Sequence, residues 1–333
     1  MTVSLAPDEV HAIVAAAARA PSVHNIQPAR WRFESDGSVV LFRALDRALP
    51  VADPTGHDVQ ASLGAAFEAM SMALSARGIS LGAPLGAGDV MADGCEPVVR
   101  ASLEQTGRAT DPLEPWLAVR RSFRGRFLPA DAGQLARLNG IAAADARLVA
   151  GGEALRALAA LHDAATWTFE SRADYHRELW SWLRLSPRDP DYHRDGLNAD
   201  CLALSAAERW AAARLLAPGP FALLGRLGIA RPLISEGASV RSASAAVVFC
   251  PLKRASAFDV GRRMLRLWLE VEAAGLHLAP MSACADDARV RPALERLHGV
   301  PAERRLANVF RVGRMDDAAV AVSPRLPVDE YLV

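Results

Sequence analysis

The sequence lacks an excess of charge of either sign. Lys plus Arg and Asp plus Glu each number 38 among the 333 residues. A chain with this balance has no overall electrostatic footprint for nucleic acid or for an anionic membrane. We therefore predict neither as a partner, although a local basic cluster can still bind a small anion.

Cysteine is scarce and widely spaced. The four cysteines are Cys95, Cys201, Cys250 and Cys284, and no CxxC pair occurs. This spacing argues against a zinc centre and a disulfide framework, so we expect no metal and a reducing compartment. The sequence also lacks a long apolar run and a signal-like start, which predicts a cytoplasmic protein.

Common nucleotide-binding and hydrolase motifs are absent as well. The sequence holds no P-loop, no HExxH and no GxSxG. The segment GAPLGAG at 82–88 is rich in glycine but does not have GxGxxG spacing, so a Rossmann dinucleotide site is not predicted. Three histidines, His162, His176 and His193, show no metal-ligand spacing, and we expect them to be solvated or to cap helices.

The composition is that of a chain with a normal packed core. Apolar residues make up 51% and charged residues 23%, and the length suggests two domains. Periodicity, Gly and Pro predict these elements: helices at 7–17, 58–77, 131–139, within 152–185 and at 258–274, strands at 31–33, 39–42, 97–103, 242–252 and 305–314, and a loop at 81–94.

Two segments share one plan. HDVQASLGAAFEAMSMALSARGISLGAP at 57–84 and FDVGRRMLRLWLEVEAAGLHLAP at 258–280 both run Asp-Val, long helix, Gly, apolar residues and Pro. Two amphipathic helices with Gly caps can match by chance. The alternative is two copies of one α+β unit, which we expect to pack as a pseudo-dimer.

Residues 160–235 have no counterpart in the first half of the chain. This segment is rich in aromatic side chains: Trp167, Phe169, Tyr175, Trp180, Trp182, Tyr192 and Trp210. The more ordinary interpretation is the core of a helical insert. The other is a lid over a planar ligand.

The strongest local charge cluster is RRSFRGRF at 120–127. In an extended segment, Arg120, Ser122 and Arg124 lie on one face. Two guanidinium groups and a hydroxyl suit a phosphomonoester, through charge-assisted bidentate hydrogen bonds. The alternative is a solvated basic turn at a domain junction. Arg325 in the C-terminal tail is a third anion ligand if the tail folds back.

The segment APSVHNIQPARW at 20–31 gathers polar side chains between two prolines. Pro21 and Pro28 stiffen its ends, so the groups between them lose little entropy on binding a ligand. Ser22 and Asn25 offer a hydroxyl and an amide suited to a polar heterocycle or a sugar-like chain. The alternative is a helix end whose polar groups satisfy the local backbone.

Together these segments resemble a known family. APSVHNIQP resembles the APSxxNxQPW signature of the nitroreductase superfamily of FMN proteins, and RRSFRGRF resembles its RxSxR phosphate motif. Residues 275–301 resemble its segment over the flavin ring, and 308–332 its last strand and tail. The order of the first two motifs is reversed here, which resembles the Acg family, in which two such units are fused in one chain. DPTG, SLGAA and HRDGLNADCL are also similar to Acg-type sequence.

The resemblance implies an α+β fold of two fused nitroreductase-like units that form a pseudo-dimer. The units are 1–112 and 113–333, and the second carries the lid-like helical insert at about 160–235. Only the first unit has the PSxxNxQP motif and only the second has RxSxR. The resemblance therefore implies one FMN site, at the interface of the two units.

The resemblance also assigns cofactor-binding residues. Arg120, Ser122 and Arg124 are expected to contact the phosphate, the ribityl chain and the pyrimidine edge, with Arg124 near N1 and O2, where positive charge stabilises a reduced flavin. Arg325 completes the phosphate site. The remaining assignments are the ring-lining residues, one of which presents a backbone amide to N5, and two residues from the first unit: Pro280, Met281, Ser282, Ala283, Ser22 and Asn25. No catalytic side chain is assigned.

Two residues depart from the family pattern. Ala29 stands where a Trp is expected, although Trp31 is close by. Ser323 stands where many relatives have a basic residue, which weakens the phosphate site. If the insert covers the ring, a nicotinamide cannot reach N5, so reduction by NAD(P)H depends on where the insert lies.

Three functions are consistent with these residues. The first is an FMN-dependent oxidoreductase that works by two-electron hydride transfer at N5 on a small-molecule substrate. Nitroaromatics, quinones, enones and a biosynthetic intermediate all suit an aromatic-lined flavin cavity. The second is a flavin-sequestering protein with little NAD(P)H-dependent turnover. The third is a structural or interaction module that has lost the cofactor.

Overall fold

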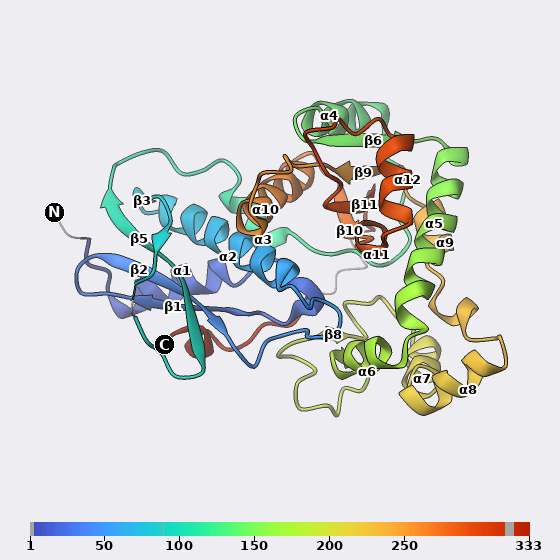
Figure 1. Cartoon of the computed structure of the whole chain (residues 1–333). Coiled ribbons are helices and arrows are strands. Elements are labelled where there is room, and N and C mark those ends of the chain that lie inside the picture. The colour runs from blue at the N-terminus through green and yellow to red at the C-terminus, as the bar shows by residue number, and fades with distance from the viewer. Residues whose placement is uncertain (1–2, 89, 317–322) are drawn as a thin grey trace.

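A computed structural model describes residues 3–88, 90–316 and 323–333 of the chain. Two separate antiparallel sheets are surrounded by helices, with α2 and α10 running between them (Figure 1). The predicted α+β class is therefore confirmed. No helix among the described residues has the length and apolar character that crossing a membrane requires.

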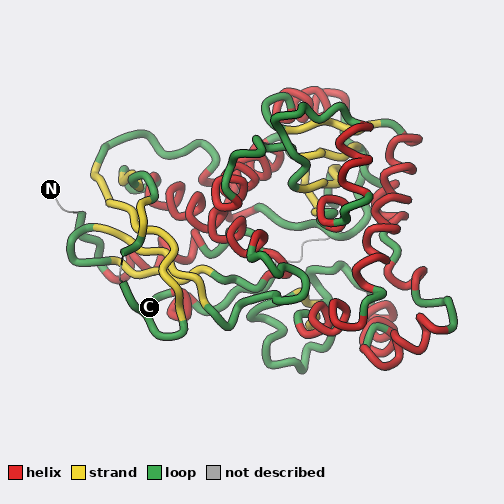
Figure 2. The backbone as a smooth tube through the Cα atoms, viewed as in Figure 1, coloured by secondary structure: helices red, strands yellow, loops and turns green. Residues whose placement is uncertain are grey.

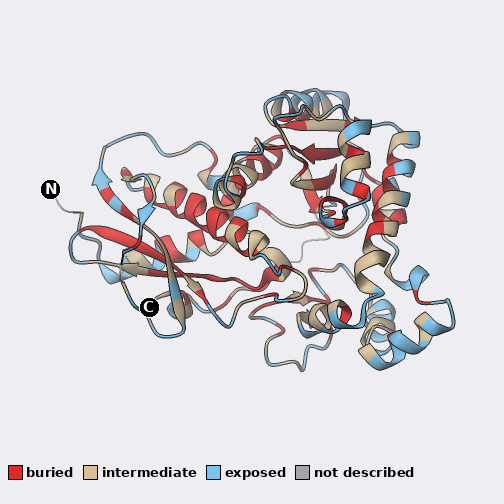
Figure 3. Ribbon diagram, in the orientation of Figure 1, coloured by how far each residue is buried: buried red, intermediate tan, exposed pale blue. Residues whose placement is uncertain are grey.

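The first part of the chain builds one sheet. Its elements are α1 Pro7–Ala17, η1 Val23–Asn25, β1 Ala29–Phe33, β2 Ser38–Ala44, α2 His57–Ser75, β3 Ile79–Leu81, β4 Leu85–Gly86, β5 Cys95–Gln105 and α3 Glu114–Val119. The strand order is β1-β2-β5-β3, with β4 also pairing with β5. Helix α2 is buried along most of its length against this sheet and against α10 (Figure 3).

The second part builds the other sheet and a large insert. Its elements are α4 Ala132–Ala142, β6 Ala146–Ala150, α5 Gly152–Glu170, α6 Ala173–Ser181, β7 Leu183–Arg184, β8 Leu197–Asn198, α7 Ala206–Leu215, α8 Pro218–Arg226, η2 Arg231–Ile234, α9 Gly237–Arg241, β9 Ala245–Phe249, α10 Ala257–Ala273, β10 His277–Pro280, α11 Ala283–Asp286, α12 Val290–Leu297, β11 Asn308–Gly313 and η4 Val328–Tyr331. The strand order is β10-β11-β9-β6.

The two sheets have the same topology. Each is built in the order helix, strand, strand, helix, strand, strand, if the short β4 is set aside. In each, the second strand and the last strand pair in the middle, and every neighbouring pair is antiparallel. The second sheet differs by long insertions, one between β6 and β9 and one between β10 and β11.

The crossing of α2 and α10 is reciprocal. A Cβ atom on Gly64 would lie 1.9 Å from the carbonyl oxygen of Phe258, and one on Gly261 would lie 1.8 Å from that of Ala61. A shift of 197 positions (261 minus 64) relates both glycines and both of their partners. Both positions therefore require glycine, because any side chain would collide with the facing backbone.

Most of the predicted elements are present, with three differences. Residues 81–94 were expected to form a loop, but β4 lies within them because Leu85 and Gly86 pair with Arg100 and Val99 of β5. Strands β3, β6 and β10 were not predicted, nor was the short pair β7 and β8. The segment inserted between β6 and β9 runs from 151 to 244, wider than the expected 160–235.

The insert contains helices joined by long loops (Figure 2). The interpretation of its aromatic side chains as core is wrong for most of them. Only Tyr192 of the seven is fully buried, five are half-buried, and Trp210 is 61% exposed. These rings therefore lie mainly at the edges of the insert.

Polar contacts tie the insert to the first part of the chain. Asp195 accepts hydrogen bonds from Arg47, in the loop after β2, and from Arg184. The carboxylate of Glu178 accepts from the backbone amides of Val51 and Ala52, at 2.9 and 2.7 Å. The insert thus reaches across from the second sheet to the loop that leads into α2.

Candidate functional site

The polar segment after α1 folds into a tight elbow. His24, Asn25 and Gln27 have φ values of 44°, 57° and 53°, in the left-handed region. Such a conformation costs about 1–3 kcal/mol for a residue other than glycine and is concentrated at functional sites. Three of these residues within four positions make the elbow the most strained part of the described backbone.

The side chain of Asn25 joins three distant parts of the chain. Its Nδ2 donates to the carbonyl oxygens of Gly196 in the insert and Pro324 in the tail, at 3.1 and 3.0 Å. Its Oδ1 accepts from Nη1 of Arg325 at 2.9 Å. The residue is only 7% exposed and its amide donors are both used, so the structure gives it a positioning role for Arg325.

Gln27 has a similar role that the sequence did not reveal. Its Nε2 donates to the carbonyl of Arg194 at 2.8 Å, and its Oε1 accepts from the amide of Leu326 and the hydroxyl of Tyr331. The predicted Ser22 supports it, because Ser22 Oγ accepts from the Gln27 amide at 3.0 Å. The Gln in the quoted NxQP pattern was the one signal for this residue.

Two predicted arginines meet at the end of α1. Arg120 Nη2 and Arg325 Nη2 both donate to the carbonyl oxygen of Arg19, at 2.9 and 3.2 Å. Arg325 Nε also donates to the carbonyl of Ala18 at 2.6 Å. The tail therefore does fold back, and it brings Arg325 beside the RRSFRGRF segment.

Arg120 has donors with no partner. It is 5% exposed, its guanidinium lies over the ring of Trp268 at 4.9 Å, and its Nε and Nη1 make no hydrogen bond. Burial, reinforced by the charge of Arg325, lowers the pKa of Arg120 to about 9, while Glu272 acts in the opposite direction. Buried charged donors without acceptors are costly, so this cluster has the chemistry of an anion site.

The rest of the RRSFRGRF segment is held against the second sheet. Ser122 forms an isolated β-bridge with Leu278 of β10, and Phe123 is buried. The carbonyls of Arg124 and Gly125 each accept a hydrogen bond of 2.8 Å from Arg311, on β11. This buried arginine was not predicted as a site residue, yet it fixes the backbone that carries Arg124.

The predicted ring segment lies at the end of β10. Pro280 ends the strand, Met281 is completely buried in the core, Ser282 is exposed and Ala283 is half-buried. The structure therefore gives the Met281 side chain a packing role. What this segment offers a ligand is its backbone and the small side chains of Ser282 and Ala283.

Two titratable groups lie near Arg124. Burial, and then the charge of Arg124, lower the pKa of His24 to about 4, so its imidazole is neutral at pH 7. Burial by itself raises the pKa of Glu236, but the hydrogen bond and charge of His162, with Arg124 and Arg311, outweigh burial and hold it at about 2. Neither His24 nor Glu236 was predicted from the sequence.

His193 is exposed, as expected, whereas His162 is buried, which contradicts the expectation that it is solvated or caps a helix. His176 is also buried, but its Nε2 lies 2.8 Å from the carbonyl oxygen of Leu216, the C-cap residue of α7, as expected of a capping histidine. His176 stacks on Phe221, with ring centroids 3.9 Å apart, and His162 lies 3.4 Å from Glu236 Oε2 and 3.7 Å from Cys284 Sγ. Burial and the nearby Asp286 raise the pKa of Cys284 to about 12. This Cys–His–Glu array therefore holds a neutral thiol and does not make a nucleophile at pH 7.

Three carboxyl groups from separate elements have raised pKa values. Burial with the charge of Glu236 raises the pKa of Glu170 to about 8. Desolvation with the charge of Asp58 raises that of Asp286 to about 7, although this residue is exposed at the surface, and burial with the charge of Asp53 raises that of Asp58 to about 6. A carboxyl group that keeps its proton near pH 7 can donate a hydrogen bond or a proton.

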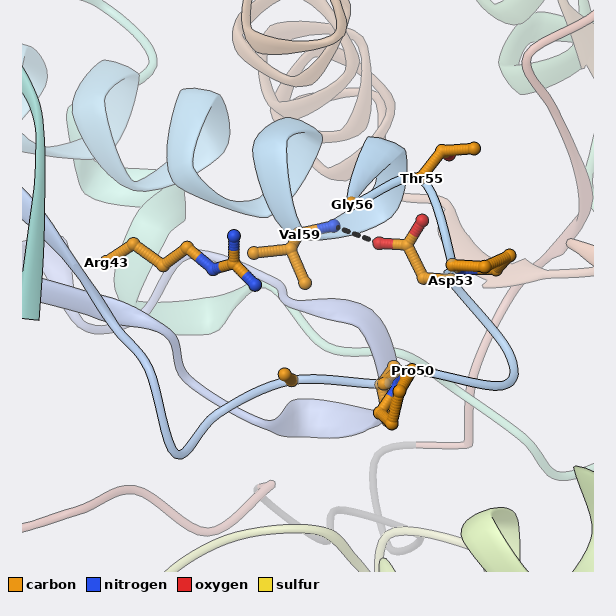
Figure 4. Close-up of a pocket in the computed structure, with 9 residues that line it drawn as sticks. Arg43, Pro50, Asp53, Thr55, Gly56 and Val59 are labelled. Carbon is orange, nitrogen blue, oxygen red and sulfur yellow. Dashed lines mark hydrogen bonds between the residues drawn. The ribbon is translucent and has the colours of Figure 1, made fainter.

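A separate cavity of about 280 Å³ lies before α2 (Figure 4). Arg43 points into it, and Asp53 caps the helix by accepting from the amide of Val59 at 2.9 Å. None of the predicted site residues lines it. Within the described part of the chain, no group of His, Cys, Asp and Glu has a metal-binding arrangement.

Comparison with known proteins gives partial matches. No protein-family model matches the chain. Over 71 residues the chain is 39% identical to the Acg protein of Mycobacterium tuberculosis strain CDC 1551, which bears the name of an NAD(P)H nitroreductase, and the match covers 21% of each chain. A second NAD(P)H nitroreductase by name from that strain is 38% identical over 71 residues, or 20% of its length. The chain thus matches about a fifth of these relatives.

Solved structures give distant matches. The FMN- and NADPH-dependent nitroreductase NfnB from Sphigopyxis sp. strain HMH is 18% identical, with 66% of this chain and 97% of that chain covered and a TM-score of 0.38. A protein from Anabaena variabilis described as a nitroreductase is 11% identical, with 94% and 90% covered and a TM-score of 0.39.

The 71-residue matches fall on proteins that share one name. Both matched proteins are nitroreductases by name, and one of them is Acg itself. The predicted resemblance to proteins named nitroreductases, Acg among them, is therefore confirmed over about a fifth of the chain.

Proposed function

We propose that this chain is an FMN-dependent oxidoreductase with one flavin site where residues 1–112 meet residues 113–333. The observation that carries the proposal is the buried Arg120. Its Nε and Nη1 have no hydrogen-bond partner, and it lies next to Arg325. A phosphate group supplies the negative charge and the acceptor oxygens that these donors lack.

A pseudo-dimer of two related units is supported by the fold. The sheets share one topology, and the glycines of α2 and α10 make reciprocal contacts, as expected for an isologous interface. The elbow comes from the first unit, while the arginine segment and the tail come from the second. The contact of Asn25 with Arg325 is therefore a contact between the units.

The proposed phosphate site consists of the free donors of Arg120, with Ser122 following in the chain, and Arg325 adds its positive charge, because each of its N–H groups already donates to a protein oxygen. Four arginines lie near one another there, Arg19, Arg120, Arg121 and Arg325, and Glu272 is the acidic group that acts on Arg120. Positive charges this close lower one another's pKa because they repel, and a bound phosphate offsets the repulsion. This excess of positive charge compensates for Ser323, which stands where a basic residue was expected.

The proposed ring site lies between Arg124 and residues 280–283. His24 is neutral and Glu236 ionised at pH 7, so Arg124 is the positive charge available for N1 and O2 of the ring. Glu236 keeps 42% of its side-chain surface accessible and His24 is half-buried, although burial shifts both pKa values strongly. That combination is expected of groups lining an internal hollow.

Bound FMN supplies two-electron hydride transfer at its N5. The protein holds the cofactor, places positive charge near N1 and O2, and excludes water from the reacting atoms. Glu170 carries a proton near pH 7, so we assign it as a candidate proton donor to a small-molecule substrate.

The test compares FMN with riboflavin, which lacks the phosphate. We expect the wild-type chain to bind FMN at least thirtyfold more tightly than riboflavin, since charge-assisted hydrogen bonds contribute about 1.5–3 kcal/mol each. In Arg120→Ala this preference should largely disappear, while the exposed Arg254→Ala should leave it unchanged. A chain that binds no FMN would refute the proposal and favour a module without cofactor.

A second candidate function is flavin sequestration with little turnover. The specific observation is the insert, which Asp195 and Glu178 tie to the first unit. If the insert covers the ring, neither NADH nor NADPH should bleach the yellow protein under anaerobic conditions, while dithionite should. Rapid bleaching by NADPH would instead support a nitroreductase-like enzyme.

A further inference from the structure

The outer end of the insert exposes a cluster of large apolar side chains. They come from α7, α8, η2 and the turn between α8 and η2, and α7 and α8 lie at the lower right in Figure 1. We call this cluster the apolar tip, and its members are Trp210 (61% exposed), Leu215 (37%), Leu223 (57%), Leu227 (63%), Ile229 (54%) and Leu233 (42%). Scattered apolar residues are normal on a surface, but six within 24 residues are not.

The local structure explains why these side chains face outward. Leu223 and Leu227 are one helical turn apart and lie on the same face of α8, while Phe221 is buried and stacks on His176. The helix ends at Gly228 (φ 74°), where the amide of Ile229 donates to the carbonyl of Leu224 at 3.0 Å. This turn keeps Ile229 at the same end of the helix.

Helix α7 adds a further solvent-facing surface. It has no fully buried residue. Its Arg214 lies over the ring of Trp210 at 4.2 Å, so both side chains extend along the outside of the helix. An Arg stacked on an exposed Trp presents an apolar ring and a positive charge together.

The charge around the apolar tip is strongly basic. Residues 206–233 contain Arg209, Arg214, Arg226 and Arg231 but one acidic residue, Glu208. Glu208 is engaged with Ser205 at the start of α7. Among the described residues, none of these four arginines forms an ion pair with a carboxylate. The balanced charge of the whole chain therefore conceals a local excess.

We propose that the apolar tip docks on the surface of an anionic lipid bilayer. Exposed Trp, Leu and Ile side chains flanked by arginines are the composition of helices that lie in a membrane interface. The arginines complement the negative surface potential, and the apolar side chains enter the boundary between headgroups and acyl chains. A second copy fits less well, since a symmetric contact would oppose like charges.

The experiment measures binding of the full chain to vesicles of phosphatidylcholine with or without phosphatidylglycerol. We expect sedimentation with the anionic vesicles, weakening as salt rises. Removing arginines in Arg226→Gln/Arg231→Gln should weaken binding roughly fivefold for each charge. Leu223→Gln/Leu227→Gln should weaken it at least tenfold.

The matched control is Leu297→Gln, since Leu297 on α12 is 64% exposed but lies outside the apolar tip. It should bind like the wild type. Absence of binding to anionic vesicles, or equal loss in the control, would overturn the proposal. So would a concentration-dependent dimer, seen by sedimentation and abolished by Leu223→Gln/Leu227→Gln, because it would show that a second copy covers the tip. The outcome is independent of FMN binding.

Discussion

At the scale of single residues, the elbow shows why polar groups can look superfluous in a sequence. Asn25 and Gln27 make their side-chain bonds to residues 194–196 and 324–331. Residue types made Ser22 and Asn25 candidates, but partners so distant in the chain cannot be seen from spacing. For the same reason His24, Gln27, Glu236 and Arg311 were not found.

The first prediction separates the backbone of Asn25 from its side chain. Asn25→Gly loses the three hydrogen bonds but keeps a residue that adopts positive φ, whereas Asn25→Ala loses the bonds and is strained as well. We expect both variants to unfold at lower urea concentration, with Ala worse by roughly 1 kcal/mol. Equal losses would show that the left-handed backbone at this position is not strained.

The second prediction concerns pH. The pKa of Glu170 is about 8 in the folded chain against 4.5 as its ordinary value. Between these values the folded chain holds a proton that the unfolded chain has lost. The free energy of unfolding therefore falls as pH rises from about 4.5 to 8. The effect is on the order of a few kcal/mol.

The measurement is the free energy of unfolding in urea across that pH range. Glu170→Gln should flatten the decline relative to the wild type, because an amide cannot ionise. Glu303→Gln, at an exposed position, is the control and should keep the decline. Parallel curves for the wild type and Glu170→Gln would contradict the raised pKa.

At the scale of elements, the two long helices were predicted well, but the sequence made no prediction of how they align where they cross. The Asp-Val pairs of the echo are 201 positions apart (259 minus 58), but the glycines that contact the opposite helix are 197 apart. The difference is about one helical turn. The echo in the sequence matches the starts of the two helices. The structure instead matches the residues at their crossing, and the glycines that follow the two helices, Gly78 and Gly275, are related by the same shift of 197.

The third prediction tests this crossing. Gly64→Ala and Gly261→Ala should each destabilise the chain by several kcal/mol, since the new methyl group meets backbone that cannot move aside. Gly140→Ala, in α4, has nothing within 4 Å and should stabilise by up to about 1 kcal/mol. The double variant should cost less than the sum, because helices already parted accommodate the second methyl. Thermal unfolding measures all four.

At the scale of the whole molecule, the insert was the hardest part to predict. Its helices carry aromatic residues that read equally well as core or as a cover, and their burial depends on what the first part of the chain places beneath them. The contacts of Arg47 with Asp195 and of Val51 with Glu178 decide how the insert is held.

The fourth prediction is that these contacts control access to the proposed flavin. Asp195→Ala releases Arg47 and Arg184, so the insert should open more often. We expect FMN to dissociate faster, by roughly tenfold for the loss of a buried charged contact. The exposed Asp200→Ala, just beyond β8, is the control. Stopped-flow fluorescence of released FMN gives both rates, and equal rates would argue against a gating role for the insert.

The bond between Asn25 and Arg325 joins residues 300 positions apart. Because both belong to one covalent chain, the elbow and the tail meet at an effective concentration set by the fold and not by the amount of protein. A site assembled from two separate subunits comes apart on dilution. Here the two halves should stay joined at any dilution, and each is free to keep only the motif that the other lacks.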